Sequence, residues 1–253
     1  MCRWVDTGYS GHHGSGMRDF WCGRILCGHA RGAGRRVCVA ADGGLDHTRE
    51  LGIVPDVVVG DFDSLEGRPP RTDVRTIALP ALKDDPDMLS ALKVGWSAGC
   101  REFHVYGGLG GRIDHTISGI QLMALLARHG ASGYLYGDGL IVTAITDGRL
   151  SFPAHPVPED GRMVSAFSHS DVSLGVNEPG LKYELKDGTL TNTVVQGVSN
   201  EFRDGVDAAI SVEHGTLIVT FPIEVALPQV SRFHEFGGDI GELDTAVSKL
   251  LVR

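Results

Sequence analysis

Three groups of aspartates stand out in the first half of the sequence, because their spacing suits the binding of a cation. They are Asp61 and Asp63 in GDFDS, Asp84, Asp85 and Asp87 in KDDPD, and Asp114 in GGRIDH. Each group follows a strand-like run or a loop and comes directly before a helix-like run. In a parallel sheet such junctions share one edge, so the three groups could converge. Converging carboxylates suit Mg²⁺, which keeps several waters and completes its shell with substrate phosphates.

Each aspartate also has an ordinary structural explanation. Aspartate is a frequent helix N-cap and is common in turns, so any one group taken alone is more simply a cap or a turn. All three groups at equivalent strand-to-helix junctions favour a shared metal site instead.

Glycine-rich stretches accompany the aspartates. YGGLGGRIDH contains Gly107, Gly108, Gly110 and Gly111 followed by Arg112, and ADGG occupies residues 41–44. Glycine lets a backbone approach phosphates closely, and arginine offers a planar fork for phosphate oxygens. Neither stretch is a Walker loop or the strict dinucleotide fingerprint. The sequence also contains no nucleophile-elbow or H-E-x-x-H motif that would indicate a different chemistry.

The elements that must position these residues alternate from about residue 36 onward. Strand-like runs cover 35–44, 55–61, 101–108, 132–139 and 140–146, and helix-like runs cover 45–53, 85–99 and 113–130. This alternation predicts βαβ units and a mainly parallel sheet. The valine run Val57–Val59 reads as a short buried strand, because no polar residue alternates with it.

The pattern changes after residue 147. Short strand-like runs separated by Gly, Asn, Asp and Pro fill 148–223, and no amphipathic helix is evident there. We therefore predict an α/β domain over 1–147, of which 1–35 has little periodicity beyond one strand, and an all-β sandwich over 148–223. The tail 224–253 could form a terminal helix, whose apolar face would hold Ile240, Leu243, Val247 and Leu250 or Leu251.

Composition narrows the function classes. The chain has 253 residues, 42% hydrophobic residues and a formal net charge of -9. The negative charge argues against a nucleic-acid binder, which needs Lys and Arg to neutralise phosphates. The sequence has neither an apolar run long enough for a membrane span nor the apolar centre of a signal peptide. Its five cysteines form no C-x-x-C pair, so we expect reduced thiols and a cytoplasmic protein without a zinc site.

Taken together, the motifs resemble the thiamine pyrophosphokinase family. The matching pieces, in chain order, are ADGGLDH, LGIVPDVVVGDFDSL, KDDPD, YGGLGGRIDH, GLKYELKDGTL, GVSNEF and ISVEHGTLIV. Each piece is modest evidence by itself. The ordered set spans about residues 37–221 and crosses from the α/β half into the β half, which makes it specific.

The resemblance implies a two-domain homodimer that transfers pyrophosphate from ATP to the hydroxyl of thiamine, giving thiamine diphosphate and AMP. It implies that Asp61, Asp63, Asp87 and Asp84 hold Mg²⁺, and that Arg112 contacts phosphate while Asp114 positions the metal or the attacking hydroxyl. Asp42, Gly43, Gly44, Gly110 and Gly111 would line the nucleotide site. Ser199 and Asn200 in GVSN would face the thiamine pyrimidine, across the dimer interface. Without the resemblance these two residues would read as a polar turn.

Two departures from the family pattern stand out. The family's Lys-Asp-x-Thr-Asp is here Lys83-Asp84-Asp85-Pro86-Asp87, so a threonine hydroxyl and one backbone N–H are absent. Proline is tolerated at the first turn of a helix, so we expect the fold to survive. The usual opening strand and glycine loop are poorly matched in WCGRILCGHARGAG.

Two other functions stay open at this point. One is a related Mg²⁺-dependent pyrophosphokinase that acts on another alcohol, such as a hydroxymethylpterin. The other is a sensor that binds thiamine or nucleotide without catalysis, which the missing threonine keeps in consideration.

Overall fold

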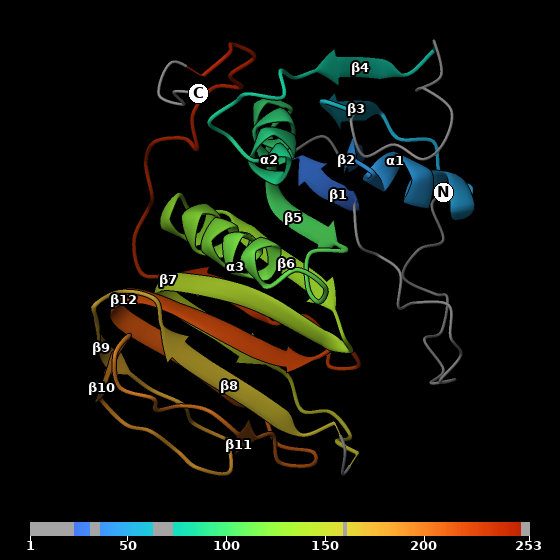
Figure 1. Ribbon diagram of the computed structural model, residues 1–253. Coiled ribbons are helices and arrows are strands. Elements are labelled where there is room, and N and C mark those ends of the chain that lie inside the picture. Colours follow the sequence, from blue (N-terminus) through green and yellow to red (C-terminus); the bar gives the residue numbers. More distant parts are fainter. Residues whose placement is uncertain (1–22, 31–35, 63–72, 159–160, 249–253) are drawn as a thin grey trace.

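The computed structural model describes residues 23–30, 36–62, 73–158 and 161–248, and of residues 23–30 it describes only the backbone. The strands are β1 (Gly23–Ala30), β2 (Arg36–Asp42), β3 (Val57–Gly60), β4 (Arg75–Ala78), β5 (Cys100–Tyr106), β6 (Ser132–Gly137), β7 (Leu140–Phe152), β8 (Met163–Ser168), β9 (Val172–Val176), β10 (Gly188–Thr191), β11 (Asn200–Glu201), β12 (Ala208–Pro222) and β13 (Gln229–Arg232). The helices are α1 (Gly44–Glu50), α2 (Asp87–Ser97) and α3 (Ile113–Arg128) (Figure 1).

The sheet that carries the aspartates is mixed, where the sequence predicts a mainly parallel one. Strands β2, β3 and β4 run parallel to one another, as do β5 and β6. Strand β1 lies between β2 and β5 and is antiparallel to both. The physical reason is the short connection, since only residues 31–35 separate β1 from β2. A parallel pair needs a crossover of a dozen or more residues.

Helices cover both faces of this sheet. α2 and α3 pack on one face, where residues such as Leu92, Phe103 and Met123 form a fully buried core. α1 packs on the opposite face, with Leu45 against Ala40 and Val58. Successive strand residues point to opposite faces, so β3 is buried on both sides, as its continuous valine run predicts. The α/β interpretation of the first half is therefore confirmed in its mixed form.

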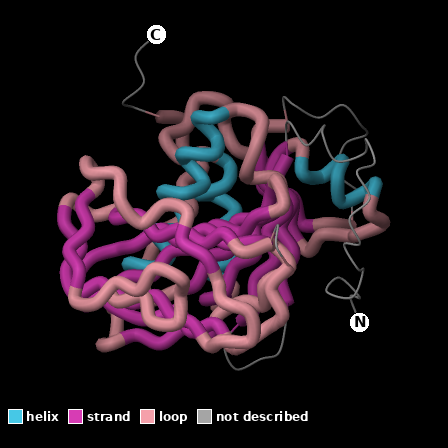
Figure 2. Tube along the Cα trace, turned by 90° about the horizontal axis from the view of Figure 1, so that it is seen from below, coloured by secondary structure: helices cyan, strands magenta, loops and turns pink. Residues whose placement is uncertain are grey.

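The long strands β7 and β12 form a wall between two cores. Their side chains alternate between Val142, Ala144 and Ile218, which pack toward α3, and residues such as Phe152 and Phe221, which pack against β8 and β9. In Figure 1 the helices lie above this wall and β8–β11 lie below it. Figure 2, seen from below, shows mainly strands and loops, because none of the described helices lies on that side.

A β-bulge interrupts the pairing of β7 with β12. The register of β12 against β7 shifts between Val212 and Thr216, and Gly215 has φ +119°. Its N–H donates to Oδ1 of Asp147 at 2.8 Å, and Asp147 itself has φ 40°. The predicted boundary between residues 147 and 148 thus falls inside the continuous strand β7, next to this bulge. Bulges sharpen the local twist of a strand pair, and the core beside β8 and β9 continues on both sides of this one.

The predicted tail helix is wrong over the residues that the structure describes. After β13, residues 233–248 contain no helix. Ile240 is nonetheless buried and Leu243 packs on the α/β core, so the tail contributes apolar contacts in an extended form. The carboxylates of Asp239 and Asp244 accept N–H bonds from residues two positions later, which competes with helical pairing. Leu250 and Leu251 lie outside the described residues.

Helix α2 starts without a side-chain cap. Pro86 is its N-cap residue, with φ -62° and ψ 150°, and Asp87 is the first helical residue. Proline therefore lies one position before the first turn, where the family's threonine would offer a hydroxyl to the exposed N–H groups. An acidic residue in the first turn interacts favourably with the helix dipole, which offsets part of that loss.

We predict that Pro86→Thr is more stable than Pro86→Ala by about 1 kcal/mol, the usual contribution of an N-cap hydroxyl. Both variants lose the same proline rigidity, so the difference isolates the cap. Urea unfolding followed by tryptophan fluorescence measures it. Equal unfolding free energies for the two variants would show that an N-cap hydroxyl does not stabilise the start of α2.

Candidate active site

Four of the predicted segments end at one edge of the sheet. Strands β2, β3, β4 and β5 all run in the same direction, because β5 and β2 are both antiparallel to β1. Asp42 ends β2, Asp61 follows β3, and the loops after β4 and β5 lead to Asp87 and Asp114. In open α/β sheets ligands bind outside this carboxyl edge. The topology therefore places the predicted acidic groups where such a ligand would lie.

Lys83 joins two of the predicted metal ligands. Its Nζ lies 3.0 Å from Oδ2 of Asp61 and 3.2 Å from Oδ1 of Asp87. Burial by itself lowers the pKa of Lys83, but hydrogen bonds and charge from Asp61 and Asp87 outweigh burial and raise the pKa above its ordinary value. The lysine is therefore charged at neutral pH. Sequence reasoning left Lys83 out of the site, although it stands directly before the acidic run in KDDPD.

The other two carboxylates of KDDPD have different partners. Oδ2 of Asp85 accepts a bond from Nζ of Lys93 in α2 at 2.5 Å. Oδ1 of Asp84 accepts a bond from the Ser248 hydroxyl at 2.5 Å, which connects it to the C-terminal tail. Asp63 lies outside the described residues. Among the described residues, three or more potential metal ligands do not come together in any one group.

The glycines around Asp42 and in the second loop allow close packing. A Cβ atom on Gly60 would lie 3.1 Å from Cα of Asp42, so the ends of β2 and β3 touch. A Cβ atom on Gly110 would lie 2.9 Å from Oδ2 of Asp138, and Gly110 has φ +83°. These positions need glycine for reasons of space and backbone conformation. Gly43 and Gly44 begin α1 beside Asp42, and Gly111, with φ 63°, leads into Arg112.

Arg112 and Asp114 pair with each other at the start of α3. Nε of Arg112 donates to Oδ1 of Asp114 at 3.1 Å, and Nη2 donates to Oδ2 at 2.5 Å. The hydrogen bond from Arg112 is the main reason why the pKa of Asp114 is lowered. Both side chains are exposed, as are the neighbouring Ile113 and Ile117. This pair faces solvent from the same sheet edge as Asp61 but from a different strand end.

Asn200 is a buried connector in the β half. Its amide oxygen accepts N–H bonds from Tyr183 at 3.0 Å and Glu201 at 2.9 Å. Its amide nitrogen donates to the Tyr183 carbonyl and to Oε2 of Glu178, both at 2.8 Å. Both amide hydrogens are therefore used within the chain. Glu178 is buried, and burial raises the pKa of its carboxyl although the bond from Asn200 opposes the rise.

Ser199 precedes this connector in a strained backbone conformation. Its φ is 60°, in the left-handed region, and its N–H donates to Oγ of Ser165 at 3.1 Å. The Asn200 network thus holds the backbone that presents the Ser199 hydroxyl. In Figure 1, β11 with Asn200 lies at the opposite end of the molecule from β3 with Asp61. A single chain does not bring the two groups of predicted residues together.

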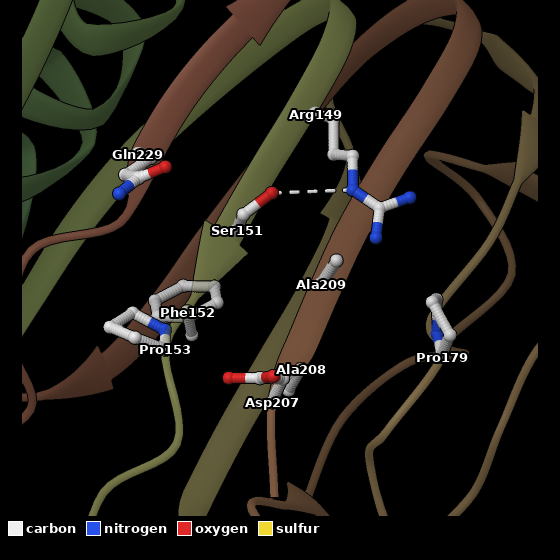
Figure 3. Close-up of a pocket in the computed structure, with 9 residues that line it drawn as sticks. All are labelled: Arg149, Ser151, Phe152, Pro153, Pro179, Asp207, Ala208, Ala209 and Gln229. Carbon is white, nitrogen blue, oxygen red and sulfur yellow. Dashed lines mark hydrogen bonds between the residues drawn. The ribbon is translucent and has the colours of Figure 1, made fainter.

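One pocket of about 350 Å³ lies elsewhere, on the outer side of β7 and β12 (Figure 3). It is lined by Arg149, Ser151, Phe152, Pro153, Pro179, Asp207, Ala208, Ala209 and Gln229. None of these is a residue that the sequence predicts for the site. The pocket has one guanidinium and one carboxylate, not grouped carboxylates at a sheet edge. The predicted site residues therefore lie away from this pocket.

The sheet edge lies in a segment of the chain that matches a known family. Residues 33–135 match the family model described as thiamin pyrophosphokinase, catalytic domain. Comparison with the sequences of curated proteins gives no significant match.

Several solved structures share the fold. Thiamine pyrophosphokinase from Bacillus subtilis is 23% identical, with a TM-score of 0.63 over 74% of this chain and 86% of that one. The enzyme from Geobacillus thermodenitrificans is 22% identical, with a TM-score of 0.61 over 75% and 87% of the two chains. The Candida albicans protein is 15% identical, with a TM-score of 0.61 over 74% and 81%.

The contacts of Asn200 and Ser199 predict that substitutions at these two positions change the free energy of unfolding by very different amounts. Asn200→Asp removes two donors and places a second carboxylate beside Glu178, so we expect the free energy of unfolding to fall by about 3 kcal/mol. Ser199→Ala removes only a hydroxyl, and we expect a change within about 0.5 kcal/mol. Urea unfolding of both variants tests this. A fully stable Asn200→Asp protein would contradict the connector role.

Proposed function

We propose that this chain, whose residues 33–135 match the family model for the catalytic domain of thiamin pyrophosphokinase, transfers pyrophosphate from ATP to thiamine, giving thiamine diphosphate and AMP. The observation that carries the proposal is the Asp61–Lys83–Asp87 group, which lies at the carboxyl edge of the sheet within the matched segment. This group provides hard oxygen ligands and a positive charge at the place where a phosphorylated ligand binds in such folds.

The reaction asks for positioning and charge neutralisation more than for covalent chemistry. The hydroxyl oxygen of thiamine attacks the β-phosphorus of ATP, and the bond from that phosphorus to the α–β bridging oxygen breaks, so AMP leaves. Arg112 would contact phosphate oxygens, which its planar guanidinium fits. Asp114, whose pKa is lowered by its hydrogen bond from Arg112, is ionised at neutral pH and would hold the attacking hydroxyl in line.

Asp61 and Asp87 fit a magnesium ion by donor type and by arrangement. Both carboxylates already reach a single cationic atom, Nζ of Lys83. We propose that they hold Mg²⁺ together with Asp63, and with Asp84 once it leaves Ser248. When bound, the ion would neutralise charge on the phosphates. Asp42, Gly43, Gly44, Gly110 and Gly111 complete the proposed nucleotide site along the same edge.

The thiamine site in this proposal needs a second copy of the chain. Within one chain β11, which begins at Asn200, lies far from β3, which Asp61 follows (Figure 1), so a homodimer would bring Ser199 and Asn200 to the nucleotide edge of the partner. Exposed apolar side chains support this arrangement, because Ile113 and Ile117 flank Asp114 while Tyr183 and Val198 flank Asn200. In this view the Ser199 hydroxyl contacts the pyrimidine and Asn200 shapes the loop.

The proposal keeps the two-domain description and the cytoplasmic location. The two buried cores, one beside α2 and α3 and one beside β8 and β9, support an α/β part over 1–147 and a β-sandwich over 148–223. Cys100 is a buried free thiol, as is common in reducing compartments. In the described part of the chain, every helix is too short or too polar to reach across a bilayer.

We predict that the purified chain releases AMP from Mg-ATP only when thiamine is present, with thiamine diphosphate as the second product. A coupled assay for AMP and chromatography of the product measure this. A parallel reaction with a hydroxymethylpterin tests the acceptor. AMP release with the pterin and none with thiamine would contradict the proposal, as would tight thiamine binding without any turnover.

We predict that Asp61→Asn lowers kcat by about a thousandfold, because losing a metal ligand removes several kcal/mol of charge stabilisation from the transition state. Glu224→Gln is the matched control, since it makes the same carboxylate-to-amide change at an exposed position in the β half. Circular dichroism checks that both variants are folded. Full activity in folded Asp61→Asn would exclude Asp61 from the metal site.

A further inference from the structure

Lys83 occupies the point at which the two best-placed carboxylates meet. Its Nζ is 3.0 Å from Asp61 at the end of β3 and 3.2 Å from Asp87 at the start of α2. The side chain of Lys83 is only 10% exposed, against 13% for Asp61 and 29% for Asp87. An ammonium group is thus held between carboxylates from two different elements, largely out of water.

Nζ of Lys83 lies at a position that also suits a divalent cation, because carboxylate oxygens from two elements reach it. Mg²⁺ binds oxygens at about 2.0–2.1 Å, so it would need the same oxygens that now face Nζ. An ammonium and a divalent ion that contact the same oxygens repel each other in a poorly hydrated site, which favours one cation at a time.

We propose that Lys83 and the divalent cation hold this position in turn. Before the metal arrives, Lys83 keeps Asp61 and Asp87 together and limits their mutual repulsion. Metal binding displaces the ammonium, and the flexible four-carbon stem then carries its positive charge toward the triphosphate at the same edge. The identity of the metal and of the triphosphate rests on the proposed function.

A second lysine shows what a purely structural ion pair looks like in the same region. Lys93 in α2 is also 10% exposed, and its Nζ is 2.5 Å from Oδ2 of Asp85. It neutralises a single carboxylate one-to-one, and a Cβ atom on Gly241 of the tail would lie 3.5 Å from its Nζ. Lys93 therefore ties α2 to its own loop beside the tail. It offers a matched control of equal burial and chemistry.

The first test measures metal binding without nucleotide or thiamine. We expect Lys83→Met to bind Mg²⁺ about tenfold more tightly than the unaltered chain in calorimetric titrations, a difference of about 1.4 kcal/mol. Lys93→Met should bind like the unaltered chain. Mg²⁺ should also raise the unfolding temperature of Lys83→Met more than that of the other two proteins, because it replaces the missing positive charge.

The second test uses the unaltered chain, so it does not depend on the folding of a variant. Acetic anhydride labelling followed by mass spectrometry reports how accessible each lysine is. Saturating Mg²⁺ should increase the labelling of Lys83 several-fold and leave Lys93 unchanged, because only Lys83 is displaced. Unchanged labelling of Lys83 at saturating Mg²⁺ would overturn the proposal, and so would equal or weaker Mg²⁺ binding by folded Lys83→Met.

A nucleotide measurement tests the second half of the proposal. With saturating Mg²⁺, a non-hydrolysable ATP analogue should bind Lys83→Met about tenfold more weakly than the unaltered chain. Equal binding would show that the released ammonium does not reach the phosphates. Failure of the thiamine-dependent AMP assay would overturn the proposed function alone, since the metal titration and the labelling need no substrate.

Discussion

The pairing of β7 with β12 is the constraint on which the rest of the molecule depends. These strands form one ladder from Phe152 opposite Ala208 to Leu140 opposite Pro222. One face supports α3 and the α/β core, and the other supports the second core, beside β8 and β9. The bulge at Gly215, held by Asp147, shifts the register of the ladder and sharpens its twist. Because both cores use the same backbone, the two halves of the chain are held in a set relation to each other.

That relation decides how a site can be assembled. The acidic edge and the Ser199–Asn200 loop lie on opposite sides of the wall, so packing within one chain keeps them apart (Figure 1). A reaction that needs both groups therefore needs a second chain, and the exposed apolar residues beside each group suit such a contact. The dimer in our proposal is in this sense a consequence of the β7–β12 ladder.

Charge balance shapes the acidic edge. Carboxylates gathered for a divalent ion repel one another until the ion arrives, and a buried group of this kind would be costly to fold. In our proposal Lys83 lets the chain fold before it binds the divalent ion, because a lysine on a flexible stem can hold the carboxylates and then move. Lys93 pairs with Asp85 without any exchange, whereas the Ser248 hydroxyl donates to Asp84 until, in our proposal, Asp84 turns to the metal.

Much of the fold can be predicted from the sequence, because it depends on residues that are close together in the chain. The alternation of strand and helix periods predicted the order of elements from β2 to β7 except for β4, which it missed, and the valine run predicted a strand buried on both faces. The position of Asp61, Asp87 and Asp114 at strand-to-helix junctions followed from the same alternation. Each of these depends on residues close together in the chain, where periodicity and turn chemistry act directly.

The features that the sequence did not predict depend on contacts between residues far apart in the chain. The direction of β1 came from the lack of room for a crossover, and the tail stayed extended because Ile240 and Leu243 reach the core without a helix. The local sequence pattern also did not predict which group each carboxylate contacts. KDDPD contains three aspartates in four residues, yet one pairs with Lys83, one with Lys93 and one with Ser248. The sequence by itself determined which residues carry charge and near which strand ends, whereas only the tertiary structure decided which charges meet, because that depends on the packing of elements far apart in the chain.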